Sequence, residues 1–217
     1  MFGIKKIKSP DFSSFYKERK DCFGNQLPEW GITSEIEEMM DIKSVLECHK
    51  EANKCLDEKV RNGMEIKDRG YKLLTILVSI FVALFGLSGF LFTYTENVCL
   101  RFFYTTILFV GIVWIFRIIY FLFKNLLLSV DYWHSGESPD YFINKQLLAW
   151  CTENNKSRSK HLLCYELNRI QDKIYFNQSE NKRRLIVINT ILYNLAYFAI
   201  GFTFFVLLYL GVRIYIS

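Results

Sequence analysis

The sequence lacks most of the short motifs that mark enzymes and metal sites. Its six cysteines form no Cys-x-x-Cys pair, which argues against a zinc ribbon or a thioredoxin-type site. Cys48, His49 and Cys55 come nearest to a metal cluster, but a fourth ligand is missing. No glycine-rich phosphate loop, His-Glu-x-x-His motif or Ser-His-Asp spacing is present. We therefore expect a protein that is not an enzyme and that uses no metal or cofactor.

Proline is scarce, with three residues in a chain of 217, and neither proline nor glycine occurs between residues 140 and 200. Long unbroken helices are expected, because these two residues are the ones that most often interrupt a helix. A signal peptide is not expected either. The first 70 residues are polar and contain no short apolar core before a small-residue cleavage site.

What the sequence does contain is apolar blocks, with 51% hydrophobic and 17% aromatic residues. Three runs stand out, at residues 73–95, 102–124 and 185–214. A bilayer core is crossed by about 20 apolar helical residues, so each run is predicted to be a transmembrane helix. Arg117 interrupts the second run and is expected at the inner edge of the hydrocarbon, where its side chain reaches the lipid head groups. A pore charge or a ligand contact is the alternative.

Lysine and arginine are distributed unevenly along the chain. Of the 27, 13 lie in residues 1–71 and ten in residues 124–184, whereas the link between the first two runs holds only Arg101. Basic residues favour the cytoplasmic side of a membrane. The predicted fold class is therefore an all-α membrane protein with three transmembrane helices, an N-terminus inside, a C-terminus outside and a helical cytoplasmic domain.

Five segments follow from these patterns. They are an N-terminal cytoplasmic arm (1–32), a cytoplasmic helix (33–71), a transmembrane hairpin (72–128), a cytoplasmic helical segment (129–184) and the third transmembrane helix (185–214). The helix of 33–71 has a thin apolar stripe and needs a partner. Antiparallel packing on another helix of this chain, or coiled-coil-like packing between subunits, would serve equally well.

Local signals mark the helix ends. Ser34 and Glu37 have the spacing of a capping box, which predicts a helix that begins at Ser34. Gly63 and Gly70 are possible bends before the membrane. Ser138 followed by Pro139 predicts another helix start, for a helix to about residue 154.

A further helix is predicted from about residue 160, and we expect it to run on without a break into the third span. Its stripe changes from apolar to polar just before the membrane. The stripe consists of Leu163, Leu167, Ile170 and Ile174, then Asn177, Asn181, Arg184 and Ile188.

Polar groups in the third span are candidates for a pore. Asn189 and Asn194 could line a water-filled path, or they could form hydrogen bonds between helices. Small residues spaced three or four apart in the first span would allow close helix packing. The predicted pore-lining or gate residues are Asn189, Tyr193, Asn194, Tyr197, Gly201 and Phe205, and the predicted packing residues are Ser79, Ala83 and Gly86.

Basic residues of the 129–184 segment could bind a phosphate-bearing ligand such as a small nucleotide. A solvated helix surface is the other interpretation, and for Lys182, Arg183 and Arg184 a positive flank of the membrane is favoured. The predicted ligand-binding residues are Lys156, Arg158, Lys160, Arg169, Asn177, Asn181 and Arg184.

One arrangement resembles a known group of proteins. A long helix leads into a membrane hairpin, then into Tyr132-Trp133-His134-Ser-Gly136-Glu-Ser-Pro139, and then into a helix with Asn168, Asn177, Asn181 and Lys182-Arg183-Arg184. This resembles the SLATT-type membrane effectors of bacterial antiphage systems and is similar to the transmembrane effector of the Hailong system.

The resemblance implies an oligomeric membrane pore that disrupts the membrane in abortive infection. We expect a symmetric homo-oligomer, pictured as a tetramer, in the bacterial inner membrane. The resemblance also implies a nucleotide or short oligonucleotide ligand made by a partner nucleotidyltransferase. The alternative function is a membrane anchor or scaffold without a channel, whose cytoplasmic helices recruit a partner.

Overall fold

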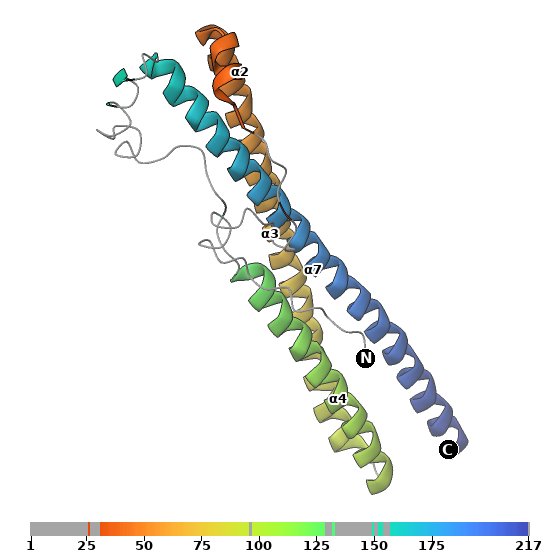
Figure 1. Ribbon diagram of the computed structural model, residues 1–217. Coiled ribbons are helices and arrows are strands. Elements are labelled where there is room, and N and C mark those ends of the chain that lie inside the picture. Colours follow the sequence, from red (N-terminus) through yellow and green to blue (C-terminus); the bar gives the residue numbers. More distant parts are fainter. Residues whose placement is uncertain are drawn as a thin grey trace. The chain divides into compact units, whose positions relative to one another are not determined.

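In the computed structural model the described residues are almost all helical. These residues are 26, 31–95, 97–128, 132, 149, 152–153 and 157–216. The elements are α2 (Ser34–Met39), α3 (Ile42–Tyr94), α4 (Val98–Leu122), the π-helix η1 (Phe123–Leu127) and α7 (Arg158–Ile216), as shown in Figure 1. The expected helical class is thus confirmed. Most of the arm at 1–32 and the predicted helix start at Ser138-Pro139 lie outside the described residues.

Three helices are long and apolar enough to cross a membrane: α3, α4 with η1, and α7. They contain the three apolar runs found in the sequence. The chain itself buries none of the most apolar stretch of α7, compared with 28% for the corresponding stretch of α4. Exposed apolar surface of this extent is rare on soluble monomers. These faces therefore require lipid or another protein surface.

The chain divides into two compact units, each built from segments distant in sequence. Unit 1 contains residues 1–65 and 130–183, and unit 2 contains residues 66–129 and 184–217. Unit 1 therefore includes α2 and the first parts of α3 and α7. Unit 2 includes the remaining parts of α3 and α7 together with α4 and η1.

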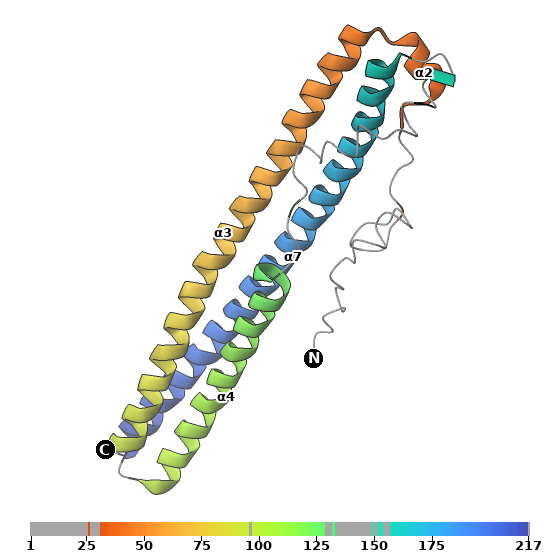
Figure 2. The same ribbon diagram turned by 90° about the vertical axis from the view of Figure 1, so that its left-hand side faces the viewer.

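In unit 1 the first parts of α3 and α7 run side by side and in the same direction (Figure 2). Their apolar stripes meet in two clusters, one with Val45, Cys164 and Leu167, the other with Leu56, Val60, Ile170 and Ile174. The partner that the thin stripe of α3 needs is therefore a parallel helix of the same chain. The antiparallel arrangement considered from the sequence does not occur here.

The helix that was expected over residues 33–71 is interrupted near its start. Thr33, and not Ser34, caps α2, since its Oγ1 accepts a hydrogen bond from the Ile36 amide at 3.4 Å. After Met40 a second helix, α3, begins at Ile42. The Oδ1 atom of the preceding residue, Asp41, accepts a hydrogen bond from the Ser44 amide at 3.1 Å. Hydrogen bonds from the Ser44 side chain and backbone lower the pKa of Asp41. The capping box predicted for Ser34 and Glu37 is wrong.

Two glycines of α3, Gly63 and Gly70, stand at close approaches to other side chains. The helix continues through both Gly63 and Gly70. A Cβ atom at Gly63 would overlap the buried ring of Tyr132, and one at Gly70 would overlap the side chain of Leu126. The helix is not interrupted at either position, and the bends there stay a prediction. Glycine fits both close approaches without a shift of Tyr132 or Leu126.

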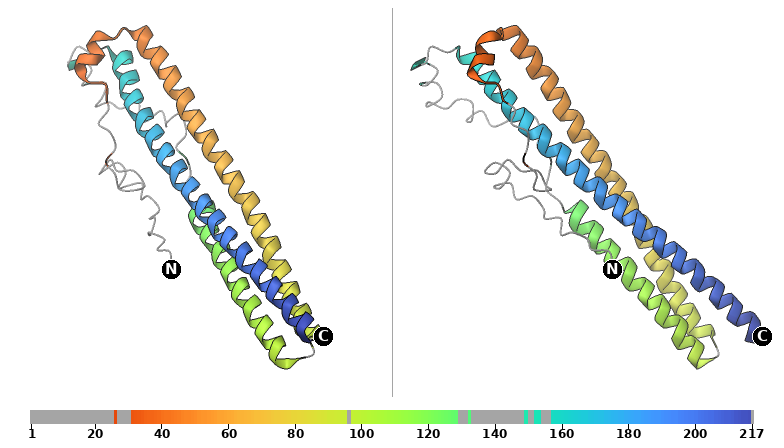
Figure 3. Two further views of the ribbon diagram at one scale, coloured as in Figure 1. Left: turned by 90° about the vertical axis from the view of Figure 1, so that its right-hand side faces the viewer. Right: turned by 45° about the vertical axis from the view of Figure 1, so that its right-hand side comes forward.

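Unit 2 contains a tight helical hairpin. Asn97 caps α4 by accepting the amides of Cys99 and Leu100 at 3.0 and 3.3 Å. Arg101 closes the link, because its guanidinium donates to the Thr95 carbonyl at 2.7 and 2.9 Å. Figure 3 shows α3 and α4 as neighbouring antiparallel helices.

The core of unit 2 is built from buried apolar residues of three helices. On α3 they include Leu77, Leu84 and Leu91 and on α4 Leu108, Ile115 and Leu122, each set spaced by about two helical turns, and on α7 they are Val187, Ile188 and Ile191. Ser79, Ala83 and Gly86 lie on exposed positions of α3, away from this core. Their predicted role in packing stays a prediction and concerns contacts beyond this chain.

Candidate functional site

A layer of polar residues on α7 is buried inside unit 1. Its members are Lys173, Asn177, Glu180, Asn181 and Arg183, all at most 8% exposed. Asn177 and Asn181 continue the apolar stripe that ends with Ile174, as the sequence pattern predicts, whereas Lys173, Glu180 and Arg183 were not part of the predicted stripe. Burial of so many polar groups is costly unless each is paired, so their partners decide what the layer does.

Glu180 and Arg183 form an ion pair within this layer. Arg183 Nη2 lies 2.6 Å from Glu180 Oε1, and Nε lies 2.8 Å from Oε2. The two side chains are only 0% and 2% exposed. The bidentate geometry supplies the strong, oriented contact that a buried charge pair needs. Arg183 is therefore an ion-pair partner inside unit 1 and not the solvated membrane flank that we favoured from the sequence.

Asn181 connects α7 to the backbone of α3. Its Nδ2 donates to the Lys59 carbonyl at 2.9 Å, across 122 residues of sequence. The buried Oδ1 of the same side chain has no hydrogen-bond partner among the described residues. The Asn181 carboxamide therefore links α7 to α3 through its Nδ2 atom, while its Oδ1 atom accepts no hydrogen bond from the described residues.

Two histidine–carboxylate pairs join α7 to the N-terminal elements of unit 1. His161 Nδ1 of α7 lies 3.1 Å from both carboxylate oxygens of Glu37 on α2. His49 Nε2 of α3 lies 2.7 Å from Glu166 Oε2 of α7. All four side chains are less than a quarter exposed. In one pair α7 contributes the histidine, and in the other it contributes the carboxylate. Together the two pairs hold α2 and α3 against α7.

The residues predicted to bind a ligand do not form one surface. Arg158 is exposed and donates to Thr152 Oγ1 at 2.7 Å, while Lys160 and Arg169 are half-buried. Asn177, Asn181 and Arg184 are buried. Lys156 lies outside the described residues. The ligand-binding role stays a prediction, and Arg158, Lys160 and Arg169 are the described members that remain accessible.

The polar residues at the start of the third span face in different directions. Asn189 and Tyr193 are exposed, with Tyr193 at 69%. Asn194 Nδ2 donates to the Thr190 carbonyl of its own helix at 2.7 Å. The hydrogen bond between helices that was an alternative for Asn194 is therefore not the one this chain forms. Asn189 and Tyr193 present polar atoms on the side of α7 opposite the core of unit 2.

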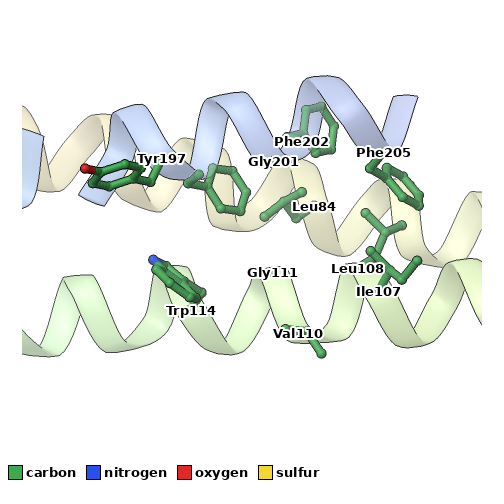
Figure 4. Close-up of a pocket in the computed structure, with 11 residues that line it drawn as sticks. Leu84, Ile107, Leu108, Val110, Gly111, Trp114, Tyr197, Gly201, Phe202 and Phe205 are labelled. Atoms are coloured by element: carbon green, nitrogen blue, oxygen red, sulfur yellow. The ribbon is translucent and has the colours of Figure 1, made fainter. Parts of the chain in front are cut away.

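The other three predicted pore residues lie beside α4. Tyr197, Gly201 and Phe205 line an apolar pocket of about 260 Å³ in unit 2, shown in Figure 4. Phe205 packs edge-on against Tyr104 of α4 with ring centroids 5.9 Å apart. Facing these residues across the pocket are α4 residues, among them Gly111 and Trp114.

The pairings that organise unit 1 were not predicted from the sequence: Glu37 and His49 were given other roles, and His161, Glu166 and Glu180 were given none. The partners in the two histidine–carboxylate pairs lie more than 100 residues apart, so helical spacing contains no signal for them. Glu180 and Arg183 do have the spacing of a helical ion pair. That pattern alone could have identified the pair, although not its burial.

Among the residues described, no three His, Cys, Asp or Glu side chains come close enough to hold a metal ion. The comparisons with known proteins give no relative from which a role could be taken: no family model, no curated protein and no solved structure matches this chain.

Proposed function

We propose that the protein is an integral membrane protein of the bacterial inner membrane, with α3, α4 and α7 as its three spans. Its N-terminus and unit 1 lie in the cytoplasm, and its C-terminus lies outside. The length and hydropathy of the three helices support the spans. The near absence of Lys and Arg from the link between α3 and α4 supports the orientation.

Within the membrane, the protein forms a homo-oligomer whose α7 helices surround a pore. The observation that carries this proposal is the exposure of Asn189 in a stretch of α7 without charged residues, with Tyr193 one turn further on. Lipid offers no hydrogen-bond partner to a carboxamide. A neighbouring subunit or a water-filled path would satisfy Asn189, and a symmetric bundle of α7 helices supplies both.

The pore is controlled by a nucleotide ligand that binds unit 1 through accessible basic residues, with Arg158, Lys160 and Arg169 as candidates. Because α7 is one helix from Arg158 to Ile216, it carries both these residues and the span. A change at the first part of α7 could therefore alter the second. The antiphage role and the partner nucleotidyltransferase rest on the resemblance to SLATT-type and Hailong effectors.

A membrane anchor that recruits a cytoplasmic partner is the second candidate. It is favoured by the internal pairing of the polar layer, in which Asn181 and Arg183 already bind atoms of unit 1. In that case the layer fixes the helices of unit 1 and binds no ligand.

Flux through liposomes separates the two functions. Asn189→Leu should reduce flux and leave the oligomeric mass unchanged if Asn189 lines a pore. Asn194→Leu is the matched control, because its carboxamide already bonds to its own helix, and it should change flux much less. Absence of flux in the unmodified protein under every ligand condition, together with no toxicity on expression, would favour the anchor.

A further inference from the structure

The pocket in unit 2 has apolar walls and carries two polar atoms at one end. Trp114 and Tyr197 lie at one end, and Ile107, Leu108 and Phe205 lie at the other (Figure 4). The indole N–H and the phenolic O–H are the only side-chain polar groups among the lining residues. Aromatic residues with one polar atom are typical of the membrane–water interface.

The shape of the pocket favours a hydrocarbon chain. Glycines from two helices, Gly111 and Gly201, leave space where side chains would otherwise stand. A Cβ atom at Gly201 would meet no other atom within 4 Å, so the space beside it is open. A cavity with apolar walls holds water poorly but accepts an apolar guest. The pocket lies within the apolar stretches of two candidate spans, so in a membrane it is surrounded by lipid. An acyl chain of a lipid is therefore the apolar ligand that we expect to enter it.

A positive charge lies beyond the polar end of the pocket. Arg117 follows Trp114 by three residues, which places it on a neighbouring part of the helix surface and about 4.5 Å further along the axis. Its side chain is exposed, and α4 and η1 contain no acidic residue that would neutralise it. A guanidinium is well suited to a phosphate group, which it binds with two parallel hydrogen bonds.

We propose that this pocket binds an anionic phospholipid, with one acyl chain between α4 and α7 and the phosphate at Arg117. The end of the pocket with Trp114 and Tyr197 is the end nearer Arg117, whose long side chain reaches the head groups at the inner edge of the hydrocarbon. This inference rests on the membrane insertion in the proposed function and does not depend on the pore or on the nucleotide.

The test is lipid binding to the delipidated full-length protein in detergent, followed by native mass spectrometry. The probes are dioleoyl phosphatidylglycerol and dioleoyl phosphatidylcholine, which share their acyl chains and differ in net charge. We expect phosphatidylglycerol to bind about tenfold more tightly, as one charged hydrogen-bonding contact would give. Arg117→Gln should remove that difference, and Gly201→Leu should weaken binding of both lipids by about tenfold or more.

Matched controls make the outcome specific. Lys124→Gln removes another cation of the same helical segment, and Gly211→Leu adds the same side chain to α7 at an open position outside the pocket. Neither should change the affinity for either lipid by more than about twofold, the scatter allowed for a surface change. Equal binding of the two lipids, or a Gly201→Leu variant that binds both normally, would overturn the proposal. A Gly201→Leu variant with normal lipid binding and an altered oligomeric mass would assign the pocket to a second copy of the chain.

Extraction of membranes with alkaline carbonate distinguishes a failure of the lipid-site proposal from a failure of the proposed function. Protein released by carbonate would contradict membrane insertion and the lipid site together. Protein that stays in the membrane but shows no preference for phosphatidylglycerol would contradict the lipid site alone.

Discussion

His49 Nε2 of α3 lies 2.7 Å from Glu166 Oε2 of α7, and this contact joins two helices whose paired residues are 117 positions apart. The Nδ2 of Asn53, one turn further along α3, lies 3.3 and 3.4 Å from the ring nitrogens of His49. The two side chains of the pair are 21% and 24% exposed, so solvent screens the contact only in part. His49 therefore fixes the register of α3 on α7 at a defined point.

A double-mutant cycle on this pair should reveal a measurable coupling. We expect about 1–2 kcal/mol between His49→Ala and Glu166→Ala in reversible chemical unfolding, because a hydrogen bond to a charged group contributes about 1.5–3 kcal/mol and solvent partly screens this pair. Lys54 and Glu51 provide the control, since they lie 3.7 Å apart with 78% and 70% exposed side chains. Their coupling should stay below about 0.5 kcal/mol. Equal coupling in the two cycles would mean that the pair at His49 is not structural.

Alanine at Gly63 should destabilise unit 1. The new Cβ would overlap the ring of Tyr132, which is buried and cannot move aside freely. We expect a loss of about 1–3 kcal/mol, as for overpacking elsewhere, measured as a lower midpoint of chemical unfolding.

Gly86→Ala in the same helix is the matched control, because nothing lies within 4 Å of the added atom. It should leave stability unchanged or raise it by up to about 1 kcal/mol, given the helix preference of alanine over glycine. The packing model of unit 1 is contradicted if both variants behave alike.

Arg183→Met should be strongly destabilising, since it leaves the carboxylate of Glu180 buried without its ion-pair partner. Losses of about 3–5 kcal/mol are typical when one member of a buried pair is removed. Lys182→Met changes an exposed neighbour of the same charge and should cost less than about 0.5 kcal/mol. Combining Glu180→Gln with Arg183→Met should cost less than the sum of the single changes. Strict additivity would show that the pair does not act as a unit.

The long helices were predictable because each one leaves a strong local pattern. Residues 73–95, 102–124 and 185–214 carry at most two charges each, and length alone then indicates a span. The continuous α7 was predictable from the absence of proline and glycine between residues 140 and 200. Its buried stripe, from Leu163 through Asn181 to Ile188, followed from helical spacing.

What could not be predicted depends on contacts between distant segments. Glu37 has the spacing of a capping residue and yet faces His161, because the tertiary partner outweighs the local motif. Gly63 was interpreted as a bend, since only a folded chain brings Tyr132 over it. Burial of Arg183 was missed for the same reason: a basic residue next to a span has the same sequence pattern whether it meets head groups or a carboxylate.

The native cysteines can test the proposed orientation. Cys99 at the start of α4 and Cys48 on α3 are both exposed, and we place the first outside the cell and the second in the cytoplasm. In variants that retain only one of them, a thiol reagent that cannot cross membranes should label Cys99 on spheroplasts and Cys48 only after permeabilisation. The reverse pattern would invert the orientation, and labelling of both on intact spheroplasts would contradict it.

Ligand-dependent ion flux tests the central claim most directly. The purified protein is placed in liposomes loaded with a fluorescent ion indicator, and candidate cyclic and linear nucleotides are added one at a time. The account predicts a flux that at least one nucleotide switches on or off, and that Asn189→Leu diminishes without loss of the oligomer. Liposomes that stay sealed with every nucleotide and without any, while the protein is inserted and oligomeric, would contradict the pore.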